Sequence, residues 1–501
     1  MHSVRASVVS LLAAASIFLS GCATDSIRDP TPWVNDHQQK YQWVPSPEHK
    51  TCVAFSGGGI RAATFSIGVM QGLNDANLLK EVDVISATSG GSYATSWLYT
   101  AVGPRNLTLD EALDPLSKEQ RRLANDAQNF VGKGWGAWSF GTGILLEPLS
   151  RAYKKLACAT AVVDQELTPG GAMAGYQSAL WLTFHGKQKP RFSELARLEG
   201  MPEFVVGASV LSGESPSCAK GHKRPTLYPA EVSRNGLKVG DILYREPPID
   251  WGINEVISAA GGATDVVAPD SKGLNLCKLP TMIRPLLGSM ACTPMVPESE
   301  KTFITDGGFT DNLAVLPLIH RQCDVIISVD ATHDPNLEFE DLKKQLTEPL
   351  KKLGVDVNQI TADISTGLTG SSFVADRAAS VVTIKNTQSG GRFVYVKLGI
   401  PAEELDNLPS LVSDTYSYSK RKYSGDTGCN IDRSGTKLSC RYPQESTLRQ
   451  TFFPSEYMAY RDLGHWITTS KLVPLLSTEG LITEDSRVSA TSELAIPEVT
   501  P

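Results

Sequence analysis

A run of three glycines between an apolar strand and an apolar helix constrains the fold of this 501-residue chain more than any other feature. Residues 52–55 are apolar and predict a short buried strand. Residues from about 60 to 73 predict a helix that is apolar on nearly every side and is therefore buried. Gly57, Gly58 and Gly59 join the two. Such a turn is typical of α/β proteins, and its main-chain N–H groups face outward, where the helix dipole favours an anion.

The other strand and helix signals alternate along the chain. A second strand at 82–86 is followed by a helix that begins at Gly90. Further strands are predicted at 204–208, 303–305, 324–330, 381–385 and 394–398. Strands that alternate with helices form mostly parallel sheets covered on both faces. We therefore expect a three-layer α/β/α domain with a mostly parallel central sheet.

Ser89 follows the second predicted strand and directly precedes the second predicted helix. A serine on such a sharp bend points its hydroxyl out of the sheet, as in the nucleophile elbow, which is usually written Gly-x-Ser-x-Gly. Here Ala87 occupies the first position, a mild departure because alanine is still small. The motif alone is weak, since serine before glycine is common in turns.

Asp306 ends the strand predicted at 303–305 and is followed by Gly307 and Gly308. Aspartate in water has a pKa near ~4 and is a weak base. It could accept the proton of Ser89 only where a desolvated pocket raises its pKa. An ordinary Asp-Gly turn is the alternative at this position. Taken together, a serine nucleophile, a carboxylate base and a glycine-rich oxyanion cradle predict hydrolysis of an acyl ester.

The glycine run has a nucleotide-binding alternative, and the residue after it needs its own explanation. A phosphate cradle requires Gly-x-x-x-x-Gly-Lys before serine or threonine, or Gly-x-Gly-x-x-Gly with a downstream acid, and neither is present. Arg61 lies in the first turn of the predicted helix, where the dipole disfavours a cation. We therefore expect Arg61 to bind an anionic group of the substrate, such as a lipid phosphate or a fatty carboxylate. A local ion pair is the alternative.

The three stretches resemble the motifs of the patatin-like phospholipases, a family that includes the catalytic region of the cytosolic phospholipase A group. The resemblance covers roughly residues 50–335 and implies a Ser–Asp dyad that works without histidine. By motif position it assigns Gly57, Gly58 and Gly59 to the oxyanion loop, Arg61 to the basic residue after it, Ser89 to the nucleophile, Asp306 to the base and Asn312 to a supporting asparagine.

The first residues predict an export signal that ends in a lipidation site. Arg5 precedes an apolar run at 8–19 that is too short to span a membrane. A Leu-Ser-Gly-Cys motif at 19–22 resembles a bacterial lipobox, so we expect cleavage after residue 21 and lipidation of Cys22, with an ordinary secretory signal as the alternative. Acyl chains on Cys22 would anchor the chain, at ~0.8 kcal/mol per buried methylene. By analogy with sorted lipoproteins, Ala23 favours the outer membrane, facing the periplasm or the surface.

Composition divides the chain into four parts. Residues 1–21 form the predicted signal peptide, and 22–48 are a polar, proline-marked linker. Residues 49–476 form the predicted acyl hydrolase domain, which includes a segment near 131–163 rich in glycine and large apolar side chains. That segment is either a lipid-touching cap or an insertion packed on the domain. Residues 477–501 are polar and acidic and predict a disordered tail.

The net charge and the cysteines limit which partners and which cellular compartment suit this chain. A net charge of −7 argues against nucleic acid as a partner. An exported chain can form disulfides, and Cys429 and Cys440 flank a polar loop that predicts a hairpin tip, so we expect them to be bridged. Cys52 and Cys323 lie in apolar runs and are expected to be buried thiols. Zinc-ligand spacings and calcium-loop patterns are missing from the sequence, so we expect no metal and no other cofactor.

The sequence therefore favours a lipid-anchored hydrolase that cleaves phospholipid or lysophospholipid esters and contacts the membrane through Cys22. One alternative is a Ser-His-Asp triad that uses His320, His333 or His465. Another is a non-catalytic, membrane-anchored binding lipoprotein with a decayed hydrolase site.

Overall fold

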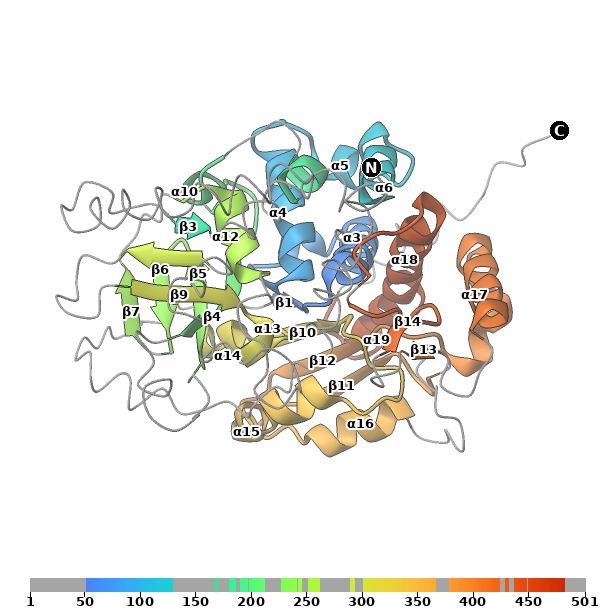
Figure 1. The fold of residues 1–501 in the computed structure, drawn as a ribbon. Helices are drawn as coiled ribbons and strands as arrows, with labels where there is room; N and C mark the ends of the chain where they lie inside the picture. Colours follow the sequence, from blue (N-terminus) through green and yellow to red (C-terminus); the bar gives the residue numbers. More distant parts are fainter. Residues whose placement is uncertain are drawn as a thin grey trace, which may run out of the picture.

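A β-sheet with helices on both faces forms the framework of the molecule (Figure 1). The computed structural model describes residues 51–128, 167–169, 180–185, 190–196, 198–211, 227–240, 242–245, 251–261, 289–292, 301–365, 378–423, 429–431, 437–447 and 449–482. Within these residues the strand order of the main sheet is β11-β12-β10-β1-β2-β4-β5-β6-β7. The predicted three-layer α/β/α architecture is confirmed.

The centre of the sheet is parallel. Its five strands are β1 (Thr51–Phe55), β2 (Val84–Thr88), β4 (Glu203–Leu211), β10 (Val325–Asp330) and β12 (Arg392–Lys397). Antiparallel strands extend it: β3 (Leu167–Pro169), β5 (Leu227–Ser233), β6 (Gly236–Val239), β7 (Ile242–Arg245), β8 (Ser289–Cys292), β9 (Lys301–Asp306) and β11 (Val382–Asn386). Every strand predicted from the sequence is present, with ends shifted by a few residues at most.

Two long helices leave the carboxyl ends of the first two strands. They are α3 (Gly59–Asp75) and α4 (Gly90–Val102), and almost all of their residues are buried, as the apolar sequence of the first predicts. Helix α18 (Pro454–Ile467) lies against α3 (Figure 1). A methyl group placed on Gly68 would lie 1.9 Å from the Arg461 carbonyl oxygen, so glycine permits this close approach. The segment 336–475, to which the sequence assigned no role, thus supplies part of the helical layer.

Shorter helices complete both faces of the sheet. Figure 1 shows α15 and α16 on the side of the sheet opposite α3, α4 and α18. The remaining helices are η1 (Leu79–Glu81), α5 (Leu109–Leu113), α6 (Lys118–Gln128), η2 (Trp181–His185), α10 (Phe192–Leu195), α12 (Ile253–Ala260), α13 (Gly308–Asp311), α14 (Leu316–His320), η5 (Leu342–Leu346), α15 (Thr347–Lys352), α16 (Val357–Ser365), η7 (Ala402–Asn407), α17 (Ser410–Lys422), η8 (Thr468–Leu472) and α19 (Val473–Thr478).

Cys52 and Cys323 form a disulfide, so their assignment as buried thiols is wrong. The reason is the register of the sheet. Strands β1 and β10 begin side by side, with Thr51 opposite Val325. The turn before β10 therefore brings the Cα of Cys323 within 6.1 Å of the Cα of Cys52, although 271 positions separate them in the sequence.

We expect reduction of this disulfide to lower the free energy of unfolding by about 2–4 kcal/mol, because the bridge closes a long loop and restricts the unfolded chain. Guanidinium unfolding of the wild-type protein with and without dithiothreitol measures the effect. The Cys52→Ser/Cys323→Ser variant cannot form this disulfide. Its free energy of unfolding should therefore equal that of the reduced wild type. Equal stability of the oxidised and reduced wild type would contradict the expectation.

The disulfide expected between Cys429 and Cys440 lies in a confirmed hairpin. Strands β13 (Cys429–Ile431) and β14 (Lys437–Cys440) pair antiparallel, and their register places residue 429 opposite residue 440. The side chains of these two cysteines lie outside the described residues, so the bridge between them stays a prediction.

Three predicted segments lie outside the described residues: the signal peptide 1–21, the linker 22–48 and the possible cap at 131–163.

The predicted tail begins too early. Helix α19 continues to Thr478, and Leu481 and Ile482 pack against the hydrophobic core, which explains why the ordered chain extends past residue 477. In the part of the chain that the structure describes, no helix combines the length and apolar character needed to cross a bilayer.

Candidate active site

Strand β4 brings the ends of two other strands together. Its first half pairs in parallel with β2, so that Gly207 lies opposite Thr88. Its second half pairs antiparallel with β9, so that Ala208 lies opposite Asp306. Because β2 and β9 run towards each other along the same neighbour, their last residues meet at consecutive positions of β4. Ser89, which follows β2, is therefore adjacent to Asp306.

Ser89 occupies the predicted bend at the start of α4. Its backbone has φ 46° and ψ −119°, a conformation that L-residues rarely adopt and that is typical of a nucleophile elbow. A methyl group on Gly90 would lie 2.1 Å from the Gly59 carbonyl oxygen, so the elbow packs directly on the glycine loop. The Ser89 hydroxyl donates a hydrogen bond of 3.1 Å to Oδ2 of Asp306.

Asp306 has the environment of a base with increased proton affinity. The residue is only 7% exposed, and its Oδ1 accepts a 2.8 Å hydrogen bond from the Gly308 N–H. Burial raises the pKa of Asp306 from 3.8 to about 6, and the hydrogen bonds from Gly308 and Ser89 limit the increase. The carboxylate is therefore still ionised at neutral pH, yet it holds a proton more strongly than an aspartate in water.

The glycine loop adopts the conformation that its residue type permits. Gly58 and Gly59 have φ of 135° and 66°, values that favour glycine. Helix α3 has neither a side-chain cap nor an acidic residue in its first turn, so its positive dipole end is open. Among the described residues, the main-chain N–H groups of Gly58 and Gly59 have no hydrogen-bond acceptor.

One of the three predicted oxyanion donors has another task. The Gly57 N–H donates a 2.8 Å hydrogen bond to the Asn312 carbonyl oxygen, so it anchors the loop and is not available for an anion. The N–H of Gly90, at the start of α4, has no acceptor in the described part of the chain and was not singled out from the sequence. Since the residue after an elbow serine commonly supplies an oxyanion donor, Gly90 joins Gly58 and Gly59 as a candidate.

Arg61 binds carbonyl oxygens of the protein itself, contrary to our expectation that it would bind an anionic group of the substrate. Its guanidinium group is buried and donates from Nε (3.1 Å) and Nη2 (2.9 Å) to the Ala331 carbonyl oxygen. Nη1 donates to the Glu445 carbonyl oxygen, and Nη2 lies 3.4 Å from Oγ1 of Thr447. Burial lowers the pKa of Arg61 to about 10, against the nearby charges of Glu445 and Asp330. Arg61 therefore holds two distant chain segments against the start of α3.

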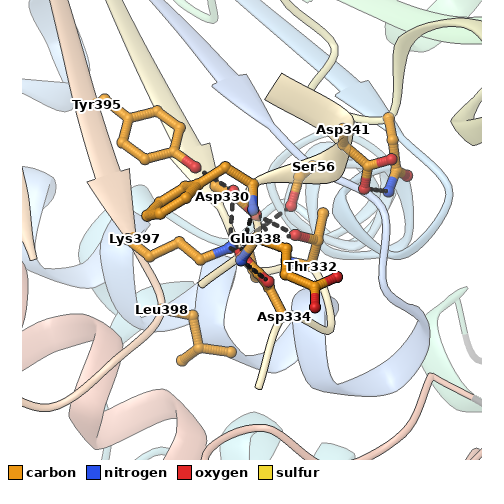
Figure 2. Close-up of polar contacts among 12 residues, drawn as sticks. Ser56, Asp330, Thr332, Asp334, Glu338, Asp341, Tyr395, Lys397 and Leu398 are labelled. Atoms are coloured by element: carbon orange, nitrogen blue, oxygen red, sulfur yellow. Dashed lines mark hydrogen bonds and ion pairs between the residues drawn. The ribbon is translucent and has the colours of Figure 1, made fainter. Parts of the chain in front are cut away.

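A buried ion cluster adjoins Ser56, the residue before the glycine loop (Figure 2). The Lys397 cluster consists of Asp330, Thr332, Asp334, Tyr395 and Lys397. Nζ of Lys397 lies 2.9 Å from Oδ2 of Asp330, 3.3 Å from Oδ2 of Asp334 and 3.3 Å from Oγ1 of Thr332. The Tyr395 hydroxyl donates to Oδ2 of Asp330. The cluster fixes the chain just after β10, the same segment that Arg61 binds.

Ser56 links this segment to the glycine loop. Its Oγ accepts a 2.8 Å hydrogen bond from the Ala331 N–H and donates to the Gly57 carbonyl oxygen at 3.1 Å. The loop is therefore held from both ends, by Ser56 before the glycines and by Arg61 after them.

No histidine of a candidate Ser-His-Asp triad hydrogen-bonds to the Ser89 hydroxyl within the described residues. His465 pairs with Asp75, with 2.7 Å between Nε2 and Oδ2. Asp75 ends the 17-residue helix α3, about 24 Å from the end of the helix at the site. In the described part of the chain the hydrogen-bond partner of the Ser89 hydroxyl is Asp306, and not His320 or His333.

Comparisons with known proteins agree with this geometry. Residues 53–210 match the family model described as "Patatin-like phospholipase", a region that includes the glycine loop and Ser89. A search of curated protein sequences found no match.

The solved structures that are similar to this chain include the following three. Human GIVD cytosolic phospholipase A2 has a TM-score of 0.52 at 11% identity, and the alignment covers 96% of this chain and 64% of that one. The same human enzyme in complex with methyl gamma-linolenyl fluorophosphonate and terbium chloride has a TM-score of 0.47 at 12% identity, with 96% and 64% covered. VipD from Legionella pneumophila has a TM-score of 0.25 at 13% identity, with 83% and 67% covered.

The first of these likenesses concerns the fold, and this chain spans less than two thirds of the length of the human enzyme. The family match ends at residue 210 and does not include Asp306. The tertiary structure places Asp306 next to Ser89. Residues 53–210, which include the elbow at Ser89, therefore match the patatin-like phospholipase family, and the fold of this chain is similar to that of human GIVD cytosolic phospholipase A2.

Proposed function

We propose that this chain hydrolyses carboxylic ester bonds of phospholipids or lysophospholipids, with Ser89 as the nucleophile and Asp306 as the base. The observation that carries the proposal is the 3.1 Å hydrogen bond from the Ser89 hydroxyl to the Asp306 carboxylate. It lies between the starts of α3 and α4, where unpaired N–H groups and two helix dipoles favour negative charge.

The reaction proceeds in two halves. Oγ of Ser89 attacks the ester carbonyl carbon while its proton passes to Oδ2 of Asp306. The N–H groups of Gly58, Gly59 and Gly90 stabilise the oxyanion of the tetrahedral intermediate. When the intermediate collapses, the alcohol part of the lipid leaves and takes the proton back from Asp306. Water then attacks the acyl-serine, again with Asp306 as proton acceptor and donor, and releases the fatty acid.

The basicity of Asp306 suits this role. A base is most effective when its pKa lies near the working pH, because it is then both ionised and strongly proton-accepting. Burial brings the pKa of Asp306 to about 6. A solvated aspartate, with a pKa near ~4, would take the serine proton less readily.

We also propose that the enzyme works in the bacterial cell envelope, tethered by lipid on Cys22. Support comes from the lipobox-like motif at 19–22 and from the disulfide between Cys52 and Cys323, a bond that persists in oxidising compartments. The phospholipid or lysophospholipid substrate would then lie in the same membrane as the anchor.

Labelling with a fluorophosphonate probe tests the proposal. We expect the probe to attach covalently to Ser89, since only an activated serine beside an oxyanion hole reacts quickly with it. Mass spectrometry of the digested protein identifies the labelled peptide. The Ser89→Ala variant should stay unlabelled. Ser66→Ala, which changes a different buried serine that lies on α3, should be labelled to the same extent as the wild type. A folded wild type that does not label would favour the non-catalytic binding lipoprotein.

A further inference from the structure

Asn312 touches both halves of the candidate site. Its carbonyl oxygen accepts the 2.8 Å hydrogen bond from the Gly57 N–H. Its Oδ1 is so close to the glycine loop that a methyl group on Gly57 would lie 2.2 Å from it. The same atom would lie 2.7 Å from a methyl group on Gly308, the residue whose N–H binds Asp306. The position of Asn312 therefore sets the separation between the oxyanion loop and the turn that carries the base.

The position of Asn312 is in turn fixed by one segment that follows the sheet. Nδ2 of Asn312 donates a 2.7 Å hydrogen bond to Oδ2 of Asp341. The main-chain N–H of Asn312 donates a 2.6 Å hydrogen bond to Oε1 of Gln345, and Nε2 of Gln345 donates to the Gly308 carbonyl oxygen at 3.0 Å. Gln345 thus uses both ends of its amide to join Asn312 to Gly308, and it is buried.

Asp341 and Gln345 belong to a short helical stretch and act as a pair. Asp341 precedes η5 and Gln345 lies within it, a π-helical turn of the kind often found at functional sites. Neither side chain hydrogen-bonds to Ser89 or Asp306, so any effect on the chemistry must pass through Asn312 and Gly308.

From these contacts we propose that Asp341 and Gln345 are positioning residues of the ester hydrolase: by holding Asn312 and Gly308, they set the distance between the oxyanion donors and the Ser89–Asp306 pair. This inference rests on the proposed function. Its physical basis is that a displacement of about 1 Å in a reacting group can lower the rate by about 10²-fold even when the substrate still binds.

The test compares two substitutions at one position. Asp341→Ala removes the acceptor of the Asn312 amide, whereas Asp341→Asn keeps an oxygen that can accept the same hydrogen bond. We expect Asp341→Ala to lower kcat by about 10²-fold with little change in KM, and Asp341→Asn to restore most of kcat. Hydrolysis of a soluble p-nitrophenyl acyl ester provides kcat and KM. Turnover is expressed per serine labelled by the fluorophosphonate, which removes any effect of a smaller folded fraction.

Two further sets of variants complete the experiment. Gln345→Leu should lower kcat in the same way. Glu340→Ala is the matched control, because Glu340 adjoins Asp341 in sequence but pairs with Lys344 at the exposed surface. We expect it to leave kcat unchanged.

The outcomes separate the inference from the function on which it rests. A wild type that neither labels at Ser89 nor hydrolyses esters would remove the proposed function itself. An active wild type with unchanged turnover per labelled serine in Asp341→Ala and Gln345→Leu would overturn the positioning role alone. Loss of folding in both of these variants, or no rescue by Asp341→Asn, would also overturn it, because the segment would then serve the fold and not the site.

Discussion

Asp306→Asn should lower kcat/KM for a phospholipid ester by about 10³–10⁴-fold, because an amide can accept the hydrogen bond from Ser89 but cannot take its proton. The fold should survive the change. Burial raises the pKa of Asp306 from 3.8 to about 6, which means that the folded state disfavours its charge, and neutral asparagine removes that unfavourable term. The melting temperature of the variant should therefore equal or exceed that of the wild type. Steady-state hydrolysis of phospholipid and lysophospholipid vesicles, together with thermal unfolding, measures both effects.

The pH profile of the wild type gives a second measurement of the same group. The base must be ionised, so kcat/KM should fall as the pH drops through about 6, the pKa of Asp306. Asp311→Asn is a matched control. Asp311 is also buried, burial raises its pKa to about 6 as well, and its Oδ2 accepts from the Leu316 N–H and not from Ser89. Activity near that of the wild type in Asp306→Asn, or an equal loss in Asp311→Asn, would refute the assignment of the base.

Lys397→Met should destabilise the protein by about 3–5 kcal/mol, because it removes one partner of a buried ion cluster and leaves carboxylates without a counter-charge. Asp330 and Asp334 both contact Nζ of this fully buried lysine. Burial alone would lower the pKa of Lys397, but the two carboxylates outweigh it and raise the pKa above its usual value. Guanidinium unfolding measures the loss. Since Ala331, in the segment fixed by the cluster, binds both Ser56 and Arg61, we also expect a lower kcat in the folded fraction.

Lys385→Met provides the matched control for this prediction. Lys385 lies on the neighbouring strand β11 and pairs with Asp363 at 2.6 Å, but both side chains are partly exposed. An ion pair of this type contributes less than about 1 kcal/mol, so the same substitution should be nearly neutral. If the two substitutions lowered the free energy of unfolding equally, burial of the Lys397 cluster would not explain its contribution to stability.

Much of the fold and part of the site followed from local sequence. The apolar runs and the glycines after them predict β1, α3, β2 and α4 because each element is only a few residues from the next, and local residue types decide its conformation. The same holds for Ser89, whose strained backbone belongs to a bend between adjacent elements. Asn312 was singled out only through the family resemblance. Its partners Asp341 and Gln345 carried no signal, since an aspartate and a glutamine in a helical segment are ordinary surface residues by pattern.

By itself, the sequence determined which residues can do chemistry: a serine on a sharp turn, an aspartate before two glycines and a glycine loop at a helix start. The tertiary structure alone decided which of them meet and which are committed elsewhere. Arg61 binds carbonyl oxygens 270 and 384 positions away, and Cys52 bonds to a cysteine 271 positions away. Gly57 gives its N–H to Asn312 in the same way. Such partners come together through strand order and register, and no local preference of the chain encodes them.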